Sequence, residues 1–125
     1  MIEIIEQVGK PLMIKAYHNF ALGLLVKLIR TPNDIYASLS LGKKPFGVVA
    51  GPPNQFKMIP VLYNSSTLLK LYYFENELSY SLGDLLYSNP WGRITSKKTY
   101  PNSIPIAFVE ENLKENENLL KIRLI

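Results

Sequence analysis

The chain has 125 residues, of which 47% are hydrophobic and 19% charged, and its formal net charge is +4. This composition excludes a disordered chain, a collagen-like fibre and a coiled coil, and the length fits one globular domain over residues 1–125. The sequence has no cysteine and one histidine, which excludes disulfides, thiolate metal sites and any two-histidine metal centre. We therefore expect neither a metal nor a cofactor.

The positive charge is unevenly distributed along the chain. Residues 7–74 contain eight Lys and Arg and one acid, Asp34, whereas acids gather at residues 110–117. Such a stretch can bind nucleic acid or another anionic ligand, although spaced lysines can equally form an ordinary solvated face. The N-terminus lacks the basic start of a signal peptide, and no apolar run reaches the roughly 20 residues that span a bilayer. We therefore expect a soluble, cytoplasmic protein without membrane contact.

The N-terminal part of the chain predicts three strands. Residues 2–7 and 12–17 are rich in apolar and β-branched side chains, and the Gly-Lys-Pro at residues 9–11 predicts a turn that joins them as a hairpin. Residues 20–29 are almost continuously apolar, which suits a helix or a strand. We favour a strand that is covered on both faces, by a helix or by a second subunit.

The middle of the chain predicts further strands separated by strong turns. The Thr-Pro-Asn-Asp at residues 31–34 favours a turn, and residues 35–41 alternate as a strand does. Residues 67–82 give the clearest hairpin pattern, because apolar residues such as Tyr80 and Leu82 alternate with serines.

The C-terminal part predicts one helix and a closing strand. Ser103 is a candidate N-cap, and Ile106, Val109 and Leu113 would then form an apolar stripe along the helix. Residues 119–125 predict the last strand. The expected fold is mainly β, a small bent sheet or partly open barrel of roughly six to eight strands with one C-terminal helix. An α+β fold is the alternative.

Several short motifs follow one another along the chain in the same order as in a known family. They are Ile-Glu-Ile-Ile-Glu at residues 2–6, Gly-Lys-Pro at 9–11, Ala-Tyr-His at 16–18, Thr-Pro-Asn-Asp at 31–34, Lys43, the pattern at 67–82 and the basic, serine-containing tract at 93–99. In this order they resemble the small archaeal proteins of domain-of-unknown-function family 371. The chain departs from that family at Lys10, where the family has His, and after His18, where Asn19 and Phe20 replace two threonines. The resemblance implies archaeal origin and fold, but no mechanism.

His18 is the candidate for acid–base chemistry, because histidine is the side-chain type that titrates near neutral pH. The predicted strands bring Asp34 toward the same rim, and together with lysines the two residues would suit an enzyme that acts on a phosphate-bearing metabolite. The alternative is a strand-end histidine bonded to a backbone carbonyl.

Cations in polar turns are the candidate phosphate ligands: Lys10, Lys43, Lys44, Arg93, Lys97 and Lys98. Ammonium groups, hydroxyls and backbone N–H groups in such loops can contact phosphates, but the spacing is not that of a P-loop. We predict a non-catalytic binding protein with a basic rim, and nucleic acid as its partner. The alternatives are the His18 enzyme and a structural component that forms a homo-oligomer.

Overall fold

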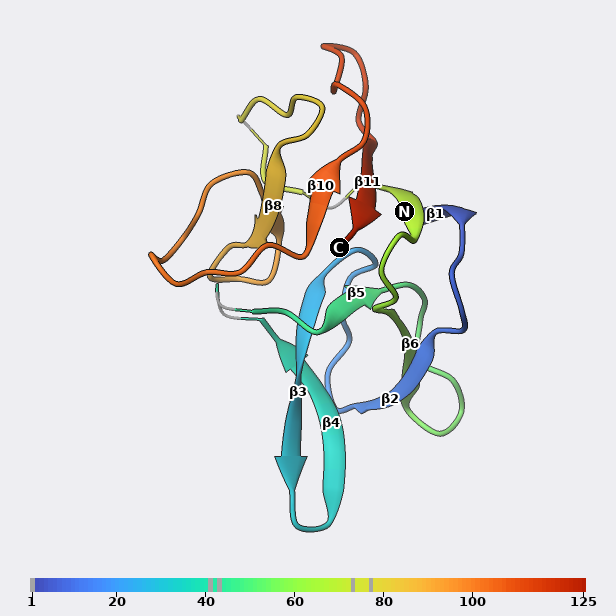
Figure 1. Ribbon diagram of the computed structural model, residues 1–125. Coiled ribbons are helices and arrows are strands. Elements are labelled where there is room, and N and C mark those ends of the chain that lie inside the picture. Colours follow the sequence, from blue (N-terminus) through green and yellow to red (C-terminus); the bar gives the residue numbers. More distant parts are fainter. Residues whose placement is uncertain (1, 41, 43, 73, 77) are drawn as a thin grey trace.

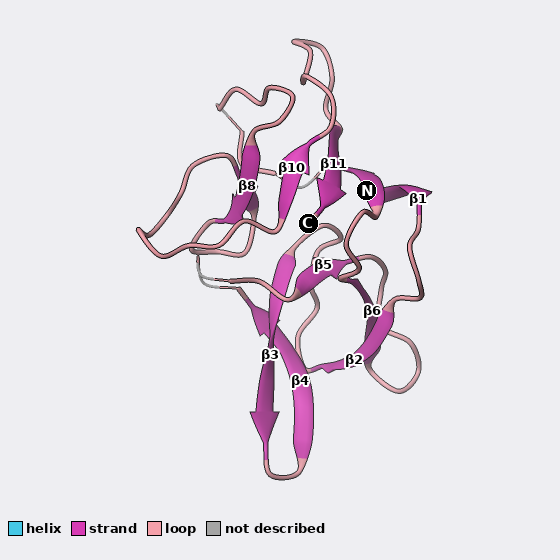
Figure 2. Cartoon of the chain, in the orientation of Figure 1, coloured by secondary structure: helices cyan, strands magenta, loops and turns pink. Residues whose placement is uncertain are grey.

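The computed structural model describes residues 2–40, 42, 44–72, 74–76 and 78–125. These residues form strands and turns (Figure 2), so the prediction of a mainly β protein is confirmed. The described residues contain no helix that is long and apolar enough to cross a membrane. The strands are β1 (Ile2–Glu6), β2 (Leu12–Ala16), β3 (Leu25–Thr31), β4 (Asp34–Leu39), β5 (Gly47–Val49), β6 (Met58–Leu62), β7 (Leu68–Leu71), β8 (Leu85–Ser88), β9 (Ile94–Thr95), β10 (Ala107–Val109) and β11 (Leu120–Leu124).

The strands are divided between a sheet and a barrel. A 6-stranded sheet has the order β1-β7-β11-β10-β8-β9, and a closed barrel has the order β2-β4-β3-β5-β6. In Figure 1 the sheet lies above the barrel. β3 and β4 belong to the barrel, and the far end of their hairpin extends downward, away from the sheet. The predicted hairpin between the first two strands is wrong, because β1 pairs with β7 while β2 pairs with β4 and β6. Residues 9–11 instead connect the sheet to the barrel.

The buried side chains form two clusters, one against the sheet and one inside the barrel, and β3 and β5 contribute to both. Alternate residues of a strand point to opposite faces, so Leu25 and Val48 pack with the sheet whereas Val26 and Val49 fill the barrel. All four side chains are fully buried. The predicted strand over residues 20–29 is present from residue 25 onward, and burial on both faces accounts for the apolar residues 24–26, while residues 27–29 are half-buried. This burial is achieved within one chain, by the sheet and the barrel interior, and needs neither the helix nor the second subunit that we expected.

The predicted hairpin over residues 67–82 is wrong. β7 pairs with β1 on one side and with β11 on the other, and the described residues 78–82 form no strand beside it. Tyr80 is buried and packs edge-on against Phe74 with 5.3 Å between ring centroids, whereas Leu82 is 64% exposed. Alternation predicts an extended segment but does not specify its partner, and both partners of β7 come from distant parts of the chain.

The predicted C-terminal helix is also wrong, and β10 occupies its place between β8 and β11. Ser103 does not cap a helix, since its hydroxyl accepts the N–H of Tyr100 at 3.0 Å and donates to the carbonyl of Gly42 at 2.6 Å. Ile106 is buried. An apolar spacing of three residues suits one face of a helix, but it also suits an irregular segment that leads into a short strand.

Two predictions in the same regions are confirmed. The Thr-Pro-Asn-Asp sequence forms the turn between β3 and β4, with Thr31 paired to Asp34 at the end of the ladder. The closing strand is β11, which lies between β7 and β10 and fully buries Ile122. The turn depends on residues close together in the sequence, and the extended form of β11 follows from its own apolar pattern, which is why local patterns predicted both.

Candidate functional site

A groove opens on the side of the barrel where two parallel strands part. The pairing of β2 with β4 joins Lys15 to Tyr36 and Ala16 to Ala37. Beyond these pairs, toward residues 12 and 34, the strands border a hollow of about 430 Å³. We call it the barrel groove, and its lining residues are Leu12, Met13, Ile14, Lys15, Asp34, Ile35, Phe56 and Met58.

The lining of the barrel groove presents large apolar side chains to solvent. Leu12, Met13 and Ile35 are exposed, and Phe56 is 67% exposed. Phe56 lies in a tight turn, in which the side-chain oxygen of Asn54 accepts the backbone N–H of Phe56 at 2.9 Å. A backbone fixed in this way needs little further ordering before its apolar side chain packs against a partner.

A charged pair and a tyrosine border the groove. The Tyr17 hydroxyl donates a hydrogen bond to Asp34 Oδ2, and Lys15 Nζ lies 3.6 Å from the same oxygen. The Tyr17 ring packs edge-on against Tyr36. The hydrogen bond from Tyr17 is the main reason that the pKa of Asp34 is below its ordinary value, and the charge of Lys15 acts in the same direction. Asp34 therefore stays ionised beside its cation, and this part of the rim is electrically balanced.

The two expected catalytic residues have different neighbours. His18 is exposed, and its ring lies edge-on to Phe20 with 6.3 Å between centroids. Asp34 forms its ion pair with Lys15. Lys43, the third expected member of this site, lies outside the described residues. Among the residues that the structure describes, no group of three His, Cys, Asp or Glu side chains could hold a metal ion.

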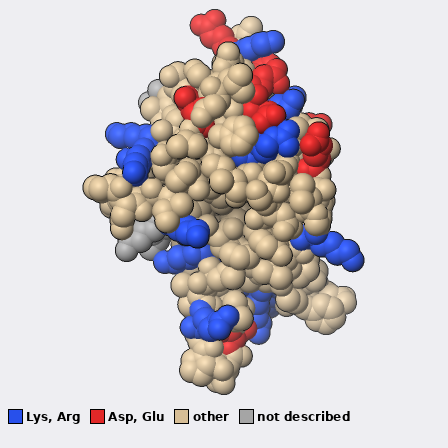
Figure 3. Space-filling model, viewed as in Figure 1, with Lys and Arg blue, Asp and Glu red and all other residues tan. Residues whose placement is uncertain are grey.

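The expected phosphate ligands fall into separate places. Lys10 is exposed in the connection between sheet and barrel, and Lys44 borders a separate hollow. Figure 3 accordingly shows Lys and Arg side chains spread over both parts of the visible face. Arg93, Lys97 and Lys98 border two adjoining hollows, and we call them the three-cation group. Of the five candidates that the structure describes, three therefore border adjoining hollows, and Lys10 and Lys44 lie apart from them.

The three-cation group surrounds an aromatic residue that sequence reasoning missed. Trp91 is 73% exposed, and it lines both hollows together with Glu75 and Asn89. In the sequence, Trp91 stands in the run Asn-Pro-Trp-Gly at residues 89–92, which is typical of a turn. The available signal was a large ring at the tip of a turn, where the chain normally lies at the surface.

Hydrogen bonds fix the turn that carries Trp91. The side-chain oxygen of Asn89 accepts the N–H groups of Trp91 and Arg93, each at 2.9 Å. Gly92 has a φ of 79°, and its carbonyl accepts the N–H of the fully buried Leu25 at 2.7 Å. The turn is thus anchored to the first residue of β3 in the barrel.

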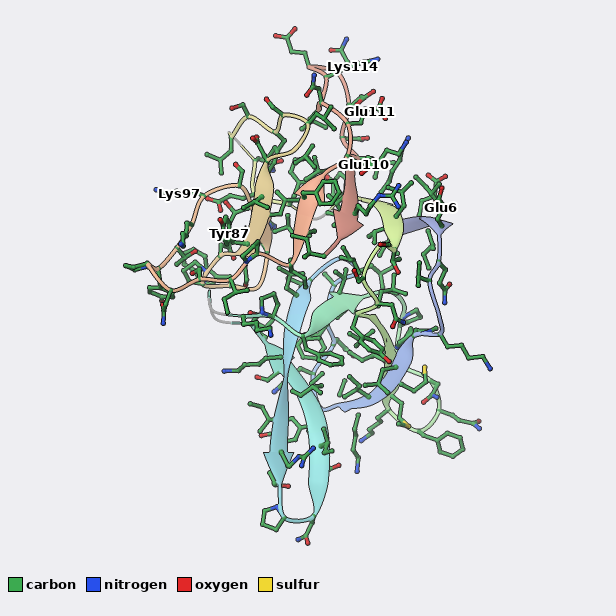
Figure 4. The ribbon with its side chains drawn as sticks, in the orientation of Figure 1. Glu6, Tyr87, Lys97, Glu110, Glu111 and Lys114 are labelled. Atoms are coloured by element: carbon green, nitrogen blue, oxygen red, sulfur yellow. The ribbon has the colours of Figure 1, made fainter. Side chains whose placement is uncertain are left out.

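Acidic side chains gather around Arg123 on β11, an inner strand of the sheet. Its guanidinium donates to both carboxylate oxygens of Glu110, at 3.1 and 3.0 Å, and lies 3.5 Å from Glu6. The hydrogen bonds from Arg123 lower the pKa of Glu110. Figure 4 shows Glu6 and Glu110 well separated from Lys97, which lies beyond β8. Lys97 therefore lies apart from the Arg123 cluster, whereas Arg93 also lines a hollow that Glu117 borders.

The fold, a sheet joined to a small barrel, is similar to that of a solved structure. No protein-family model and no curated protein matches the sequence. The head fiber gp8.5 N base of bacteriophage phi29 is similar to 100% of this chain and 95% of its own, with a TM-score of 0.62 and 15% sequence identity. At this identity the likeness establishes the fold, while the resemblance to domain-of-unknown-function family 371 stays a prediction.

Proposed function

We propose that the protein is a non-catalytic structural module that assembles with further copies of itself through the barrel groove. The observation that carries this proposal is the exposed apolar lining of the groove, with Phe56 exposed in its tight turn. Contiguous apolar surface of this kind marks interfaces between proteins. The likeness to a head fiber base over the whole chain supports a structural role, because that protein is part of a fibre.

A second copy is the partner that the charges of the groove favour. Lys15 and Asp34 lie side by side at its rim, so the surface carries one charge of each sign next to the apolar lining. Two such surfaces that meet around a two-fold axis set cation against anion while their apolar parts pack together. A strongly charged partner would gain no comparable attraction here.

Sedimentation velocity of the full chain over a range of concentrations tests this proposal. We expect reversible self-association that Phe56→Ser weakens, because the largest exposed ring of the groove is lost. Leu82→Ser is the matched control, since Leu82 is 64% exposed in the turn before β8 and outside the groove. A chain that is monomeric at every concentration would contradict the proposal, and so would an equal loss of association in both variants.

Nucleic acid is the second candidate partner, and one observation favours it: the three-cation group meets beside the exposed Trp91. An enzyme that acts on a phosphate-bearing metabolite through His18 has less support. In the described part of the chain, no hydrogen bond or ion pair joins the His18 imidazole to Asp34 or to a cation.

A further inference from the structure

Two adjoining hollows meet at the ring of Trp91. One is about 470 Å³ in volume and is lined by Glu75, Asn89, Trp91 and Arg93. The other is about 270 Å³ and is lined by Glu75, Asn89, Pro90, Trp91, Lys97, Lys98 and Thr99. Because Trp91 lines both, the ring lies where the hollows adjoin, and a flexible chain can pass from one to the other across it. We call this surface the Trp91 face.

The Trp91 face combines a planar apolar ring with positive charge. An indole that is 73% exposed leaves most of its surface in water, and covering it with another aromatic ring is favourable. Among the residues that the structure describes, three cations and the carboxylate of Glu75 border the two hollows. The ligand that satisfies both features carries flat rings and repeated negative charges along one chain.

From these features we infer that the Trp91 face binds single-stranded nucleic acid, with a base stacked on the indole and the neighbouring phosphates held by the three-cation group. This inference gives the second candidate function its site, and it is independent of self-association through the barrel groove. Stacking of bases on aromatic rings together with phosphate contacts is how sheet and barrel proteins bind single strands.

The geometry favours a single strand over a duplex. In a duplex the faces of the bases are stacked on one another, so an exposed indole finds no free ring to cover. The carboxylate of Glu75 lies 3.4 Å from the amide nitrogen of Asn89, inside the region shared by the two hollows. A carboxylate there repels phosphate but can accept a hydrogen bond from a base amino group, so the phosphates should lie toward Lys97 and Lys98.

The anchoring of the turn reduces the cost of binding. The hydrogen bonds of Asn89 and the contact of Gly92 with Leu25 hold the Trp91 backbone before any ligand arrives. A ligand therefore pays little entropy to order the turn. Because the protein has one tryptophan, its intrinsic fluorescence reports directly on this ring.

Titration of the full chain with single-stranded oligo(dT) of about 15 nucleotides at low salt tests the inference. We expect saturable quenching of Trp91 fluorescence, with an affinity that falls as salt rises. Anisotropy of a labelled oligonucleotide should show binding weakened about 5- to 150-fold in Trp91→Ala. The double variant Lys97→Ala/Lys98→Ala should reduce the salt slope by about 0.7 for each phosphate contact that is lost.

The matched control removes the same charge elsewhere. Lys10 and Lys114 are exposed and do not border the two hollows, so Lys10→Ala/Lys114→Ala should leave oligo(dT) binding nearly unchanged. Three results would each overturn the inference: no binding at micromolar protein, equal losses in the two double variants, or a duplex of the same length bound as tightly as the single strand. Circular dichroism of each variant excludes misfolding as the cause of a loss.

Discussion

Replacement of Gly92 with alanine should disrupt the contact between the Trp91 turn and the barrel. A Cβ atom at this position would lie 2.9 Å from the carbonyl oxygen of Leu25 and 3.1 Å from Leu39 Cδ2. The Leu25 oxygen belongs to a fully buried residue whose N–H bonds to Gly92 itself, so it has little freedom to move. The backbone must also keep a φ of 79°, which L residues other than glycine disfavour.

Two costs contribute to the expected destabilisation by Gly92→Ala. The left-handed backbone costs about 1–2 kcal/mol for an alanine. Forcing a methyl group against a packed backbone costs about 1–3 kcal/mol more, as in overpacked cores. Gly83 separates the two costs, because it has a φ of 89° but no atom within 4 Å of the added Cβ. Gly83→Ala should therefore lose only the backbone contribution.

Urea unfolding monitored by far-ultraviolet circular dichroism measures both variants. We expect Gly92→Ala to lower the free energy of unfolding by about 2–5 kcal/mol and Gly83→Ala by about 1–2 kcal/mol. Equal losses in the two variants would refute the reasoning, because they would mean that the Trp91 turn does not press against Leu25.

Three further substitutions test the core and two of the ionisable groups whose pKa is shifted. Ile122→Ala should lower the free energy of unfolding by about 2–5 kcal/mol, since Ile122 is fully buried, and a loss under about 1 kcal/mol would mean loose packing in the sheet. Arg123 lowers the pKa of Glu110, so their pairing stabilises the fold above pH 4.5, the ordinary pKa of the carboxyl, and ceases to do so as the pH falls. Glu110→Gln should therefore lower the urea midpoint at neutral pH but not in acid. A difference in midpoint between parent and variant that is the same at both pH values would contradict this. Burial raises the pKa of Tyr80 above the ordinary 10.0, so the stability that the neutral phenol contributes is present below that pH and is lost as the pH rises beyond it. The parent chain should therefore lose stability at alkaline pH more steeply than Tyr80→Phe. Parallel alkaline unfolding curves of the two proteins would count against this.

The candidate sites were only partly predictable from the sequence. Charge and side-chain type made Lys97 and Lys98 candidate phosphate ligands, and the structure places both beside one hollow. Neither pattern nor composition pointed to Trp91, because its role depends on which residues the fold places around the turn. The barrel groove was equally hidden, since it exists where β2 and β4 separate and no local feature records that pairing.

The sequence by itself determined strand character, the turn between β3 and β4, and the closing strand β11, because alternation, proline and asparagine act over a few residues. Only the tertiary structure decided the partners of β1 and β7 and the extended form of residues 107–109. Ile2 pairs with Leu71, and residue 107 pairs with strands on both of its sides. Such pairings are stabilised by burying side chains from distant segments against one another, and that free energy exists only once the segments have met.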